Sequence, residues 1–204
     1  MTKTCFTNVY ISTLSDCKVR SVFPIERDQE ITSCTNPTQQ KQKYIAWKLL
    51  EFGIKNSLNK DINNFSFTKH DSGKWVSNEI EFSITNSKDL VAVAISSSPI
   101  GVDAEEISDK VLKLSKIPTD EIAEFDSLSH DDKLAFLTQK WTVMESALKC
   151  LNLKSLFTTN LCLQKDQTFS QALILNDRHY VLSTYGLTAP QTQIFFVDSS
   201  EFVK

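Results

Sequence analysis

Two stretches of helical periodicity, each followed by segments in which apolar and polar residues alternate, constrain the fold of this chain most. Apolar residues recur at intervals of three and four over residues 37–58 and again over residues 130–151. That spacing places them on one face of an α-helix, whereas alternation is typical of a β-strand. The chain is therefore predicted to be α+β, with two similar halves that each pack a long helix on a small antiparallel sheet.

The predicted halves are residues 1–105 and 106–204. Asn36 is a suitable N-cap for the first long helix, and Pro37 suits its first position. Short helices are expected to begin after Ser108 and Thr119. Strands are predicted at residues 5–11, 82–84, 90–95 and 100–105, and then at 161–163, 169–175, 180–185 and 193–197, with a hairpin over residues 65–76. No linker rich in glycine or proline separates the halves, so we expect them to pack against each other.

The composition excludes several classes of function. A net charge of -3 argues against nonspecific nucleic-acid binding, although it leaves room for a local basic pocket that holds a small polyphosphate. The longest apolar run, residues 90–95, is too short to cross a membrane. The five cysteines show no CxxC spacing, and no signal peptide is evident. We expect a cytoplasmic monomer with reduced thiols and no membrane partner.

The first group of residues that could carry chemistry lies in the strand predicted at residues 100–105. Asp103 and Glu105 would share one face of that strand, while Val102 and Ala104 face the core. Two such carboxylates repel each other unless solvent or a cation separates them, and Mg²⁺ takes oxygen ligands of this kind. From these residues alone, a solvated acidic strand end is the favoured interpretation, because surface acids are common.

The second group lies on the second long helix. Glu145 and Lys149 are four residues apart on one helical face, one turn after Trp141. Glutamate before lysine at this spacing is also the ordinary arrangement of a surface salt bridge, which contributes about 0.2–0.5 kcal/mol. Taken alone, this pair is more typical of a structural salt bridge than of catalysis.

Taken in order, the two groups resemble the bipartite signature of the 4'-phosphopantetheinyl transferase superfamily, Gly-Val-Asp-x-Glu followed by Trp-x-x-x-Glu-Ser-x-x-Lys. The length and the two halves resemble its pseudo-dimeric class, the type that activates surfactin synthetase, rather than the short trimeric holo-ACP synthases. The segment that ends in Gly73-Lys74 and the strand that carries Thr85-Asn86-Ser87 resemble further motifs of the family. The resemblance runs from about Lys41 to Lys149.

The resemblance implies an enzyme that transfers the 4'-phosphopantetheine arm of coenzyme A to a serine of an apo carrier protein and releases 3',5'-ADP. It implies that Asp103, Glu105 and Glu145 hold Mg²⁺, and that Glu145 is also the candidate base for the serine. Lys149 would stabilise the phosphate and the leaving nucleotide. The other implied coenzyme A ligands are Lys41, Lys43, Lys74, Thr85 and Asn86. For Lys41 and Lys43 a solvated helix face is an equally good interpretation.

Two positions depart from the family pattern. Met144 stands where the family usually has lysine, and Asn86 where it usually has histidine. Both changes remove a potential cation from a site for a polyanion, but the implied metal ligands remain, so activity is expected. Two alternatives stay open: a degenerate member that binds coenzyme A or a carrier protein without catalysis, and an unrelated α+β interaction protein. The sequence does not identify the carrier protein.

Overall fold

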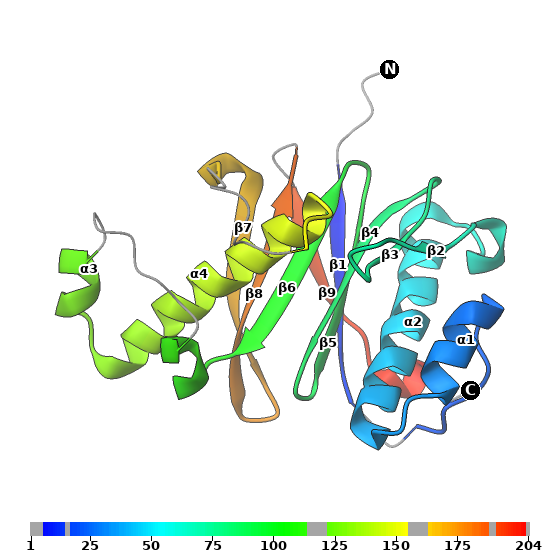
Figure 1. The fold of residues 1–204 in the computed structure, drawn as a ribbon, viewed down its shortest axis with the longest axis horizontal. Coiled ribbons are helices and arrows are strands. Elements are labelled where there is room, and N and C mark those ends of the chain that lie inside the picture. Colours follow the sequence, from blue (N-terminus) through cyan, green and yellow to red (C-terminus); the bar gives the residue numbers. More distant parts are fainter. Residues whose placement is uncertain (1–5, 15–16, 114–121, 155–162, 188–190, 203–204) are drawn as a thin grey trace.

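The computed structural model describes residues 6–14, 17–113, 122–154, 163–187 and 191–202, and it confirms the predicted mixture of helices and strands (Figure 1). One sheet has the strand order β4-β5-β1-β9, from β4 (Glu81–Ser87), β5 (Leu90–Ser96), β1 (Thr7–Thr13) and β9 (Thr192–Phe196). The other is antiparallel and has the order β6-β8-β7, from β6 (Ile100–Glu106), β8 (Arg178–Gly186) and β7 (Thr168–Leu175). A short hairpin joins β2 (Thr68–Lys69) to β3 (Trp75–Val76).

Both long helices form where the periodicity predicts them, as α2 (Pro37–Leu58) and α4 (His130–Cys150). The side chain of Asn36 accepts a hydrogen bond from the amide of Gln39, so the predicted N-cap is confirmed. At α4, Ser129 does the same for the amide of Asp132. The shorter elements are α1 (Ile25–Thr32), α3 (Ile122–Ser127), η1 (Ile62–Asn64), η2 (Asp109–Lys113), η5 (Lys165–Gln167) and η6 (Ser199–Phe202).

Most predicted strands form at the expected centres with shifted ends, but the match is incomplete. Parts of three predicted elements lie outside the described residues: Cys5 of the first strand, residues 161 and 162 of the strand predicted at 161–163, and the start of the helix expected after Thr119. Helix α1 was not predicted. It is only eight residues long, and of its two isoleucines Ile31 is buried whereas Ile25 is exposed, so it offers too few apolar repeats to reveal a helical face.

Each sheet carries one long helix, and the two sheets pack on each other. Helix α2 packs on the face of the first sheet that carries Tyr10, Val93 and Ile95. Helix α4 packs on the second sheet, where Ala147 and Cys150 meet Tyr185. The opposite faces form a shared core that includes Val9, Ala92, Val102, Ala104 and Leu182. Val102 and Ala104 therefore face the core, as predicted.

The sheets do not follow the order of the sequence. Strand β6, which ends the predicted first half, pairs with β8, and β9 from the end of the chain pairs in parallel with β1. The division of the chain at residue 105 stays a prediction.

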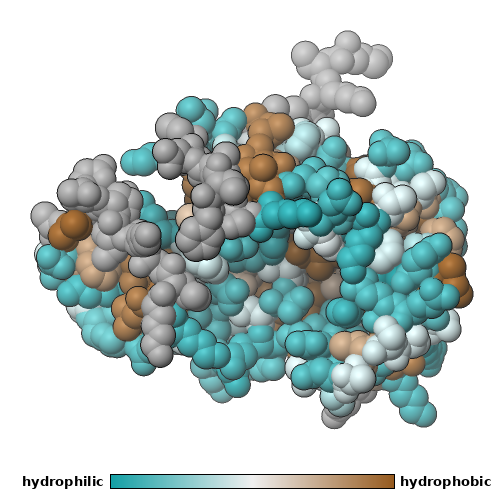
Figure 2. All heavy atoms as spheres, viewed as in Figure 1, coloured by the Kyte–Doolittle hydropathy of each residue, from teal (hydrophilic) through white to brown (hydrophobic). Residues whose placement is uncertain are grey.

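The face of the molecule that carries α4 and α2 is largely polar. Figure 2 shows hydrophilic side chains over most of it, with apolar residues in small groups. Among the helices of the described ranges, none combines the length and the hydrophobicity of a membrane span.

Gly101 allows α4 to lie directly against β6. A Cβ atom at this position would lie 1.8 Å from the carbonyl oxygen of Ser146 and 2.7 Å from the amide nitrogen of Cys150. Ser146 and Ala147, both small and fully buried, complete this contact. The helix backbone is therefore close enough to the strand for side chains of α4 to reach those of β6.

We predict that Gly101→Ala lowers the free energy of unfolding by about 3 kcal/mol, the upper part of the range for overpacking, because the added methyl group meets backbone that cannot rotate away. Urea denaturation measures the change. Gly73→Ala is the control: Gly73 has a φ of 88° and no atom within 4 Å of a Cβ, so only the left-handed backbone is penalised, by about 1–2 kcal/mol. Equal losses in the two variants would contradict the close contact.

Candidate active site

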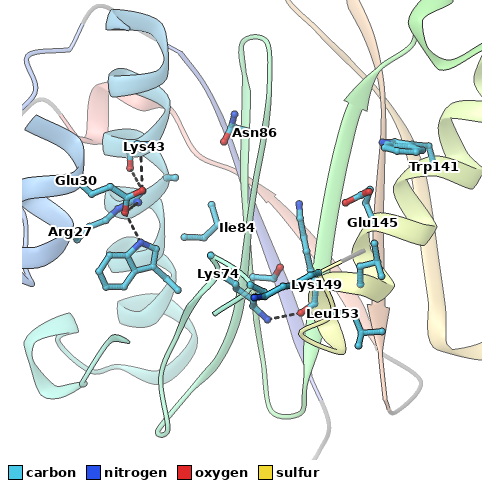
Figure 3. A pocket seen from close by; sticks show the side chains of 17 residues that line it. Arg27, Glu30, Lys43, Lys74, Ile84, Asn86, Trp141, Glu145, Lys149 and Leu153 are labelled. Atoms are coloured by element: carbon cyan, nitrogen blue, oxygen red, sulfur yellow. Dashed lines mark hydrogen bonds and ion pairs between the residues drawn. The ribbon is translucent and has the colours of Figure 1, made fainter. Parts of the chain in front are cut away.

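A cavity of about 530 Å³ lies between helices α1 and α2 on one side and α4 on the other, and residues of β4 and of the β2–β3 hairpin also line it. Figure 3 shows Arg27, Glu30 and Lys43 on one side of it, Trp141 and Glu145 on the other, and Ile84 and Asn86 of β4 between them. Among the described residues that line it, five are cationic and two are acidic: Arg27, Lys43, Lys74, Lys149 and Lys154 against Glu30 and Glu145. A chain of net charge -3 thus concentrates positive charge in one place, which suits a polyanionic ligand.

Asp103 is buried, with only 5% of its surface exposed. Neither Asp103 nor Glu105 is among the described lining residues, but Asp103 pairs with Lys149, which lines the cavity. Its Oδ1 atom accepts hydrogen bonds from Thr85 Oγ1 at 3.0 Å and from Lys149 Nζ at 2.7 Å. Its Oδ2 atom is buried and has no hydrogen-bond partner in the described structure. A buried carboxylate oxygen without a partner is costly, so it fits a position that a cation fills. The interpretation of Asp103 as part of a solvated acidic strand end is therefore wrong.

Glu105 and Glu145 share this environment. Burial raises the pKa of Glu105, the negative charges of Asp103 and Glu145 raise it further, and the hydrogen bond from Ser87 and the charge of Lys149 offset part of the rise. Burial and the charge of Asp103 likewise raise the pKa of Glu145, against the opposing charge of Lys149. The three carboxylates are thus close enough to repel one another.

Lys149 links the strand to the helix. Besides its ion pair with Asp103, its Nζ donates to the backbone carbonyl of Val102 at 3.1 Å. The ion pair that the structure gives Lys149 is therefore with Asp103 of β6, rather than with Glu145 of its own helix. Lys74 of the hairpin donates to the carbonyl of Lys149 at 2.9 Å, and burial lowers the pKa of Lys74 (Figure 3).

Within the described ranges, no three histidine, cysteine or acidic side chains gather tightly enough to form a metal site by themselves. Mg²⁺ seldom needs such a cage, because it commonly takes one or two carboxylates and completes its shell with water and substrate phosphates. The unpartnered Oδ2 of Asp103 and the neighbouring carboxylates of Glu105 and Glu145 are the oxygen donors that such an ion prefers.

The opposite wall of the cavity holds a charge cluster that the sequence did not reveal. Glu30 of α1 pairs with Arg27 at 3.0 Å and with Lys43 and Lys69 at 3.2 Å each, and it accepts a hydrogen bond from Trp75 Nε1 at 2.8 Å. Burial raises the pKa of Glu30, but the hydrogen bond from Trp75 and the three cations outweigh it and lower this pKa to about 2. Within the sequence, only the three-residue spacing of Arg27 and Glu30 indicates an ion pair of this cluster, because Lys43, Lys69 and Trp75 are distant from Glu30 along the chain.

The coenzyme A ligands expected from the resemblance divide into two groups. Lys43, Lys74 and Asn86 line the cavity. Lys41 is half-buried and is not among the described lining residues, whereas Lys43 pairs with Glu30. Thr85 is buried and donates to Asp103 instead of lining the cavity.

The region that carries these residues is similar to known proteins. Residues 99–194 match the family model of the 4'-phosphopantetheinyl transferase superfamily (ACPS). The predicted resemblance to this superfamily is therefore confirmed, and the matched region begins just before β6 and includes all of α4. The chain is also similar to the 4'-phosphopantetheinyl transferase gsp of Aneurinibacillus migulanus, with 26% identity over 129 residues. That alignment covers 62% of this chain and spans about half, 54%, of the relative's length.

We predict that Glu30→Gln lowers stability at neutral pH and flattens its acid dependence. A carboxyl group whose pKa falls from 4.5 to about 2 on folding stabilises the protein above pH 4.5, and this contribution is lost as the pH falls through about 2. With a discount for partial exposure, the loss should be about 1–2 kcal/mol.

Urea denaturation at pH 7 and at pH 3 measures this effect. Glu26→Gln, on the exposed side of the same helix, is the matched control. It removes an acid from the first helical turn and should lower the free energy of unfolding by only about 0.5 kcal/mol at pH 7, and by less at pH 3. A Glu30→Gln protein that keeps the acid dependence of the wild type would contradict the cluster.

Proposed function

We propose that this chain is a magnesium-dependent 4'-phosphopantetheinyl transferase, which moves the phosphopantetheine arm of coenzyme A to a serine of an apo carrier protein and releases 3',5'-ADP. The observation that carries the proposal is the unpartnered buried Oδ2 of Asp103, whose other oxygen pairs with Lys149 of the cationic cavity. The superfamily match and the relative named as a transferase support it. The packing of one long helix on each sheet is in keeping with the pseudo-dimeric class.

The cations of the cavity suit the phosphates of coenzyme A. Lys149, Lys74 and Lys43 would bind these phosphates, and Lys149 would also offset the charge on the departing nucleotide. Asn86 can donate a neutral hydrogen bond from the floor of the cavity. Mg²⁺, held by Asp103, Glu105 and Glu145, would neutralise charge on the phosphoryl oxygens.

Glu145 is the proposed base. Because burial and Asp103 raise its pKa, its carboxylate binds a proton more readily than an exposed glutamate does. The serine oxygen forms a bond to the phosphorus that bears the pantetheine arm, the bond from that phosphorus to the oxygen of 3',5'-ADP breaks, and the serine proton passes to Glu145.

The alternatives differ in what they bind. An unrelated interaction protein would not bind coenzyme A, whereas a degenerate member would bind it without turnover. Asp103, Glu105, Glu145 and Lys149 are all retained here, although Met144 and Asn86 replace potential cations, and this retention favours the active enzyme. The monomeric state and the cytoplasmic location stay predictions, and no particular carrier protein is predicted.

We predict that Glu145→Gln lowers the rate of 3',5'-ADP release at saturating Mg²⁺ by at least about a hundredfold, the lower end for loss of a general base. The fold should be retained, because the substitution keeps the shape of the side chain. Release is followed by chromatography with an apo carrier protein as acceptor. Asp131→Asn, on the exposed first turn of the same helix, is the control and should keep the wild-type rate. Comparable rates for Glu145→Gln and Asp131→Asn would exclude Glu145 as the base.

We predict that Asn86→His tightens the binding of coenzyme A. A charge-assisted hydrogen bond contributes about 1.5–3 kcal/mol, against about 0.5–1.5 for a neutral one. The gain should appear in KM more than in kcat, because the contact exists before and during the reaction. Calorimetry at pH 5.5 and pH 8 tests it, since the gain requires a protonated histidine. Unchanged affinity at the lower pH would show that residue 86 does not contact a phosphate.

A further inference from the structure

Strands β4 and β6 belong to different sheets, and a row of hydroxyl groups joins them. Ser83, Thr85 and Ser87 alternate along β4, so their side chains point to the same face. Ser83 Oγ accepts a hydrogen bond from the amide of Val102 at 3.1 Å. Thr85 and Ser87 instead donate to side-chain carboxylates of β6. Ser87 Oγ also accepts a hydrogen bond from the amide of Glu106 at 3.3 Å, so the row has two backbone contacts and two carboxylate contacts.

Each carboxylate is held by β4 through one of its two oxygens. Thr85 Oγ1 donates to Oδ1 of Asp103 at 3.0 Å, and Ser87 Oγ donates to Oε2 of Glu105 at 2.7 Å. Oδ1 of Asp103 also accepts a hydrogen bond from Lys149 Nζ, while Oδ2 is buried and has no hydrogen-bond partner among the described residues. A carboxylate tied at one oxygen cannot rotate freely, so its other oxygen points in a fixed direction.

We infer that Thr85 and Ser87 are positioning residues, which orient Asp103 and Glu105 so that one oxygen of each is presented to a divalent cation. This inference rests on the proposed function, because the cation is part of that proposal. Thr85 acts through Asp103 and does not line the cavity with the coenzyme A ligands. Hydrogen bonds from outside the ligand shell commonly raise metal affinity by about 10–100-fold.

The row of hydroxyls could serve only to pack β4 against β6, rather than to orient the carboxylates. A variant of Ser83 distinguishes these two roles. All three side chains are buried in the contact between the strands, with exposures of 1% for Ser83, 5% for Thr85 and 8% for Ser87. Only Ser83 bonds solely to backbone among the hydrogen bonds described above. Its removal should weaken the contact between the strands without turning either carboxylate.

The test is a titration of the whole protein with Mn²⁺ alone, with the free ion followed by electron paramagnetic resonance and with a thermal melt of each variant. Thr85→Val keeps the shape of the side chain and removes the hydroxyl, and it should raise the Kd for Mn²⁺ by about 10–100-fold. Thr85→Ser restores a donor and should bind Mn²⁺ within about threefold of the wild type, a change smaller than the roughly 10–100-fold expected for loss of the hydrogen bond.

Ser83→Ala should lower the melting temperature and leave the Kd for Mn²⁺ unchanged. Ser87→Ala, at the more exposed end of the row, should also raise the Kd for Mn²⁺. If Thr85→Val does not fold, the Kd of Ser87→Ala tests the inference instead. Equal Kd values in the wild type and in the folded Thr85→Val or Ser87→Ala protein would overturn the inference while the proposed function stands. A wild type that binds no Mn²⁺ would overturn both.

Discussion

The contact between Gly101 and the backbone of α4 is the constraint on which the site depends. Because no side chain stands between them, the helix approaches β6 closely enough for Lys149 to reach both Val102 and Asp103. A single methyl group would separate the two motifs of the superfamily signature. The glycine of the first motif and the small Ser146 of the second therefore have a packing role that accompanies the chemistry of their charged neighbours.

The site combines two opposite electrostatic environments. On one side, Asp103, Glu105 and Glu145 repel one another, and burial raises the pKa of both glutamates. On the other, the cluster of Arg27, Lys43 and Lys69 is balanced by a single carboxylate, Glu30. A ligand that carries phosphates together with a divalent cation complements both sides. This is why we propose a magnesium-dependent transfer from coenzyme A.

Local features of the fold were predictable, and contacts between distant segments were not. Asn36 and Pro37 determine where α2 begins. A continuous apolar run reveals β5 and alternation reveals β8, because these signals lie within a few residues. The pairing of β9 with β1, the ion pair of Lys149 with Asp103 and the cluster around Glu30 join segments far apart in the chain. The resemblance brought Asp103, Glu105 and Glu145 together, but it assigned Thr85 to coenzyme A, whereas its hydroxyl donates to Asp103.

The central claim is that this chain modifies a carrier protein. Intact-mass spectrometry of an apo carrier protein, incubated with the protein, Mg²⁺ and coenzyme A, tests it most directly, and a panel of fatty-acid, polyketide and nonribosomal-peptide carriers covers the unknown partner. The account predicts that at least one carrier gains the mass of a single phosphopantetheine arm on its serine, and that a chelator abolishes the gain. Unmodified masses across the whole panel, with the protein folded and coenzyme A bound, would contradict it.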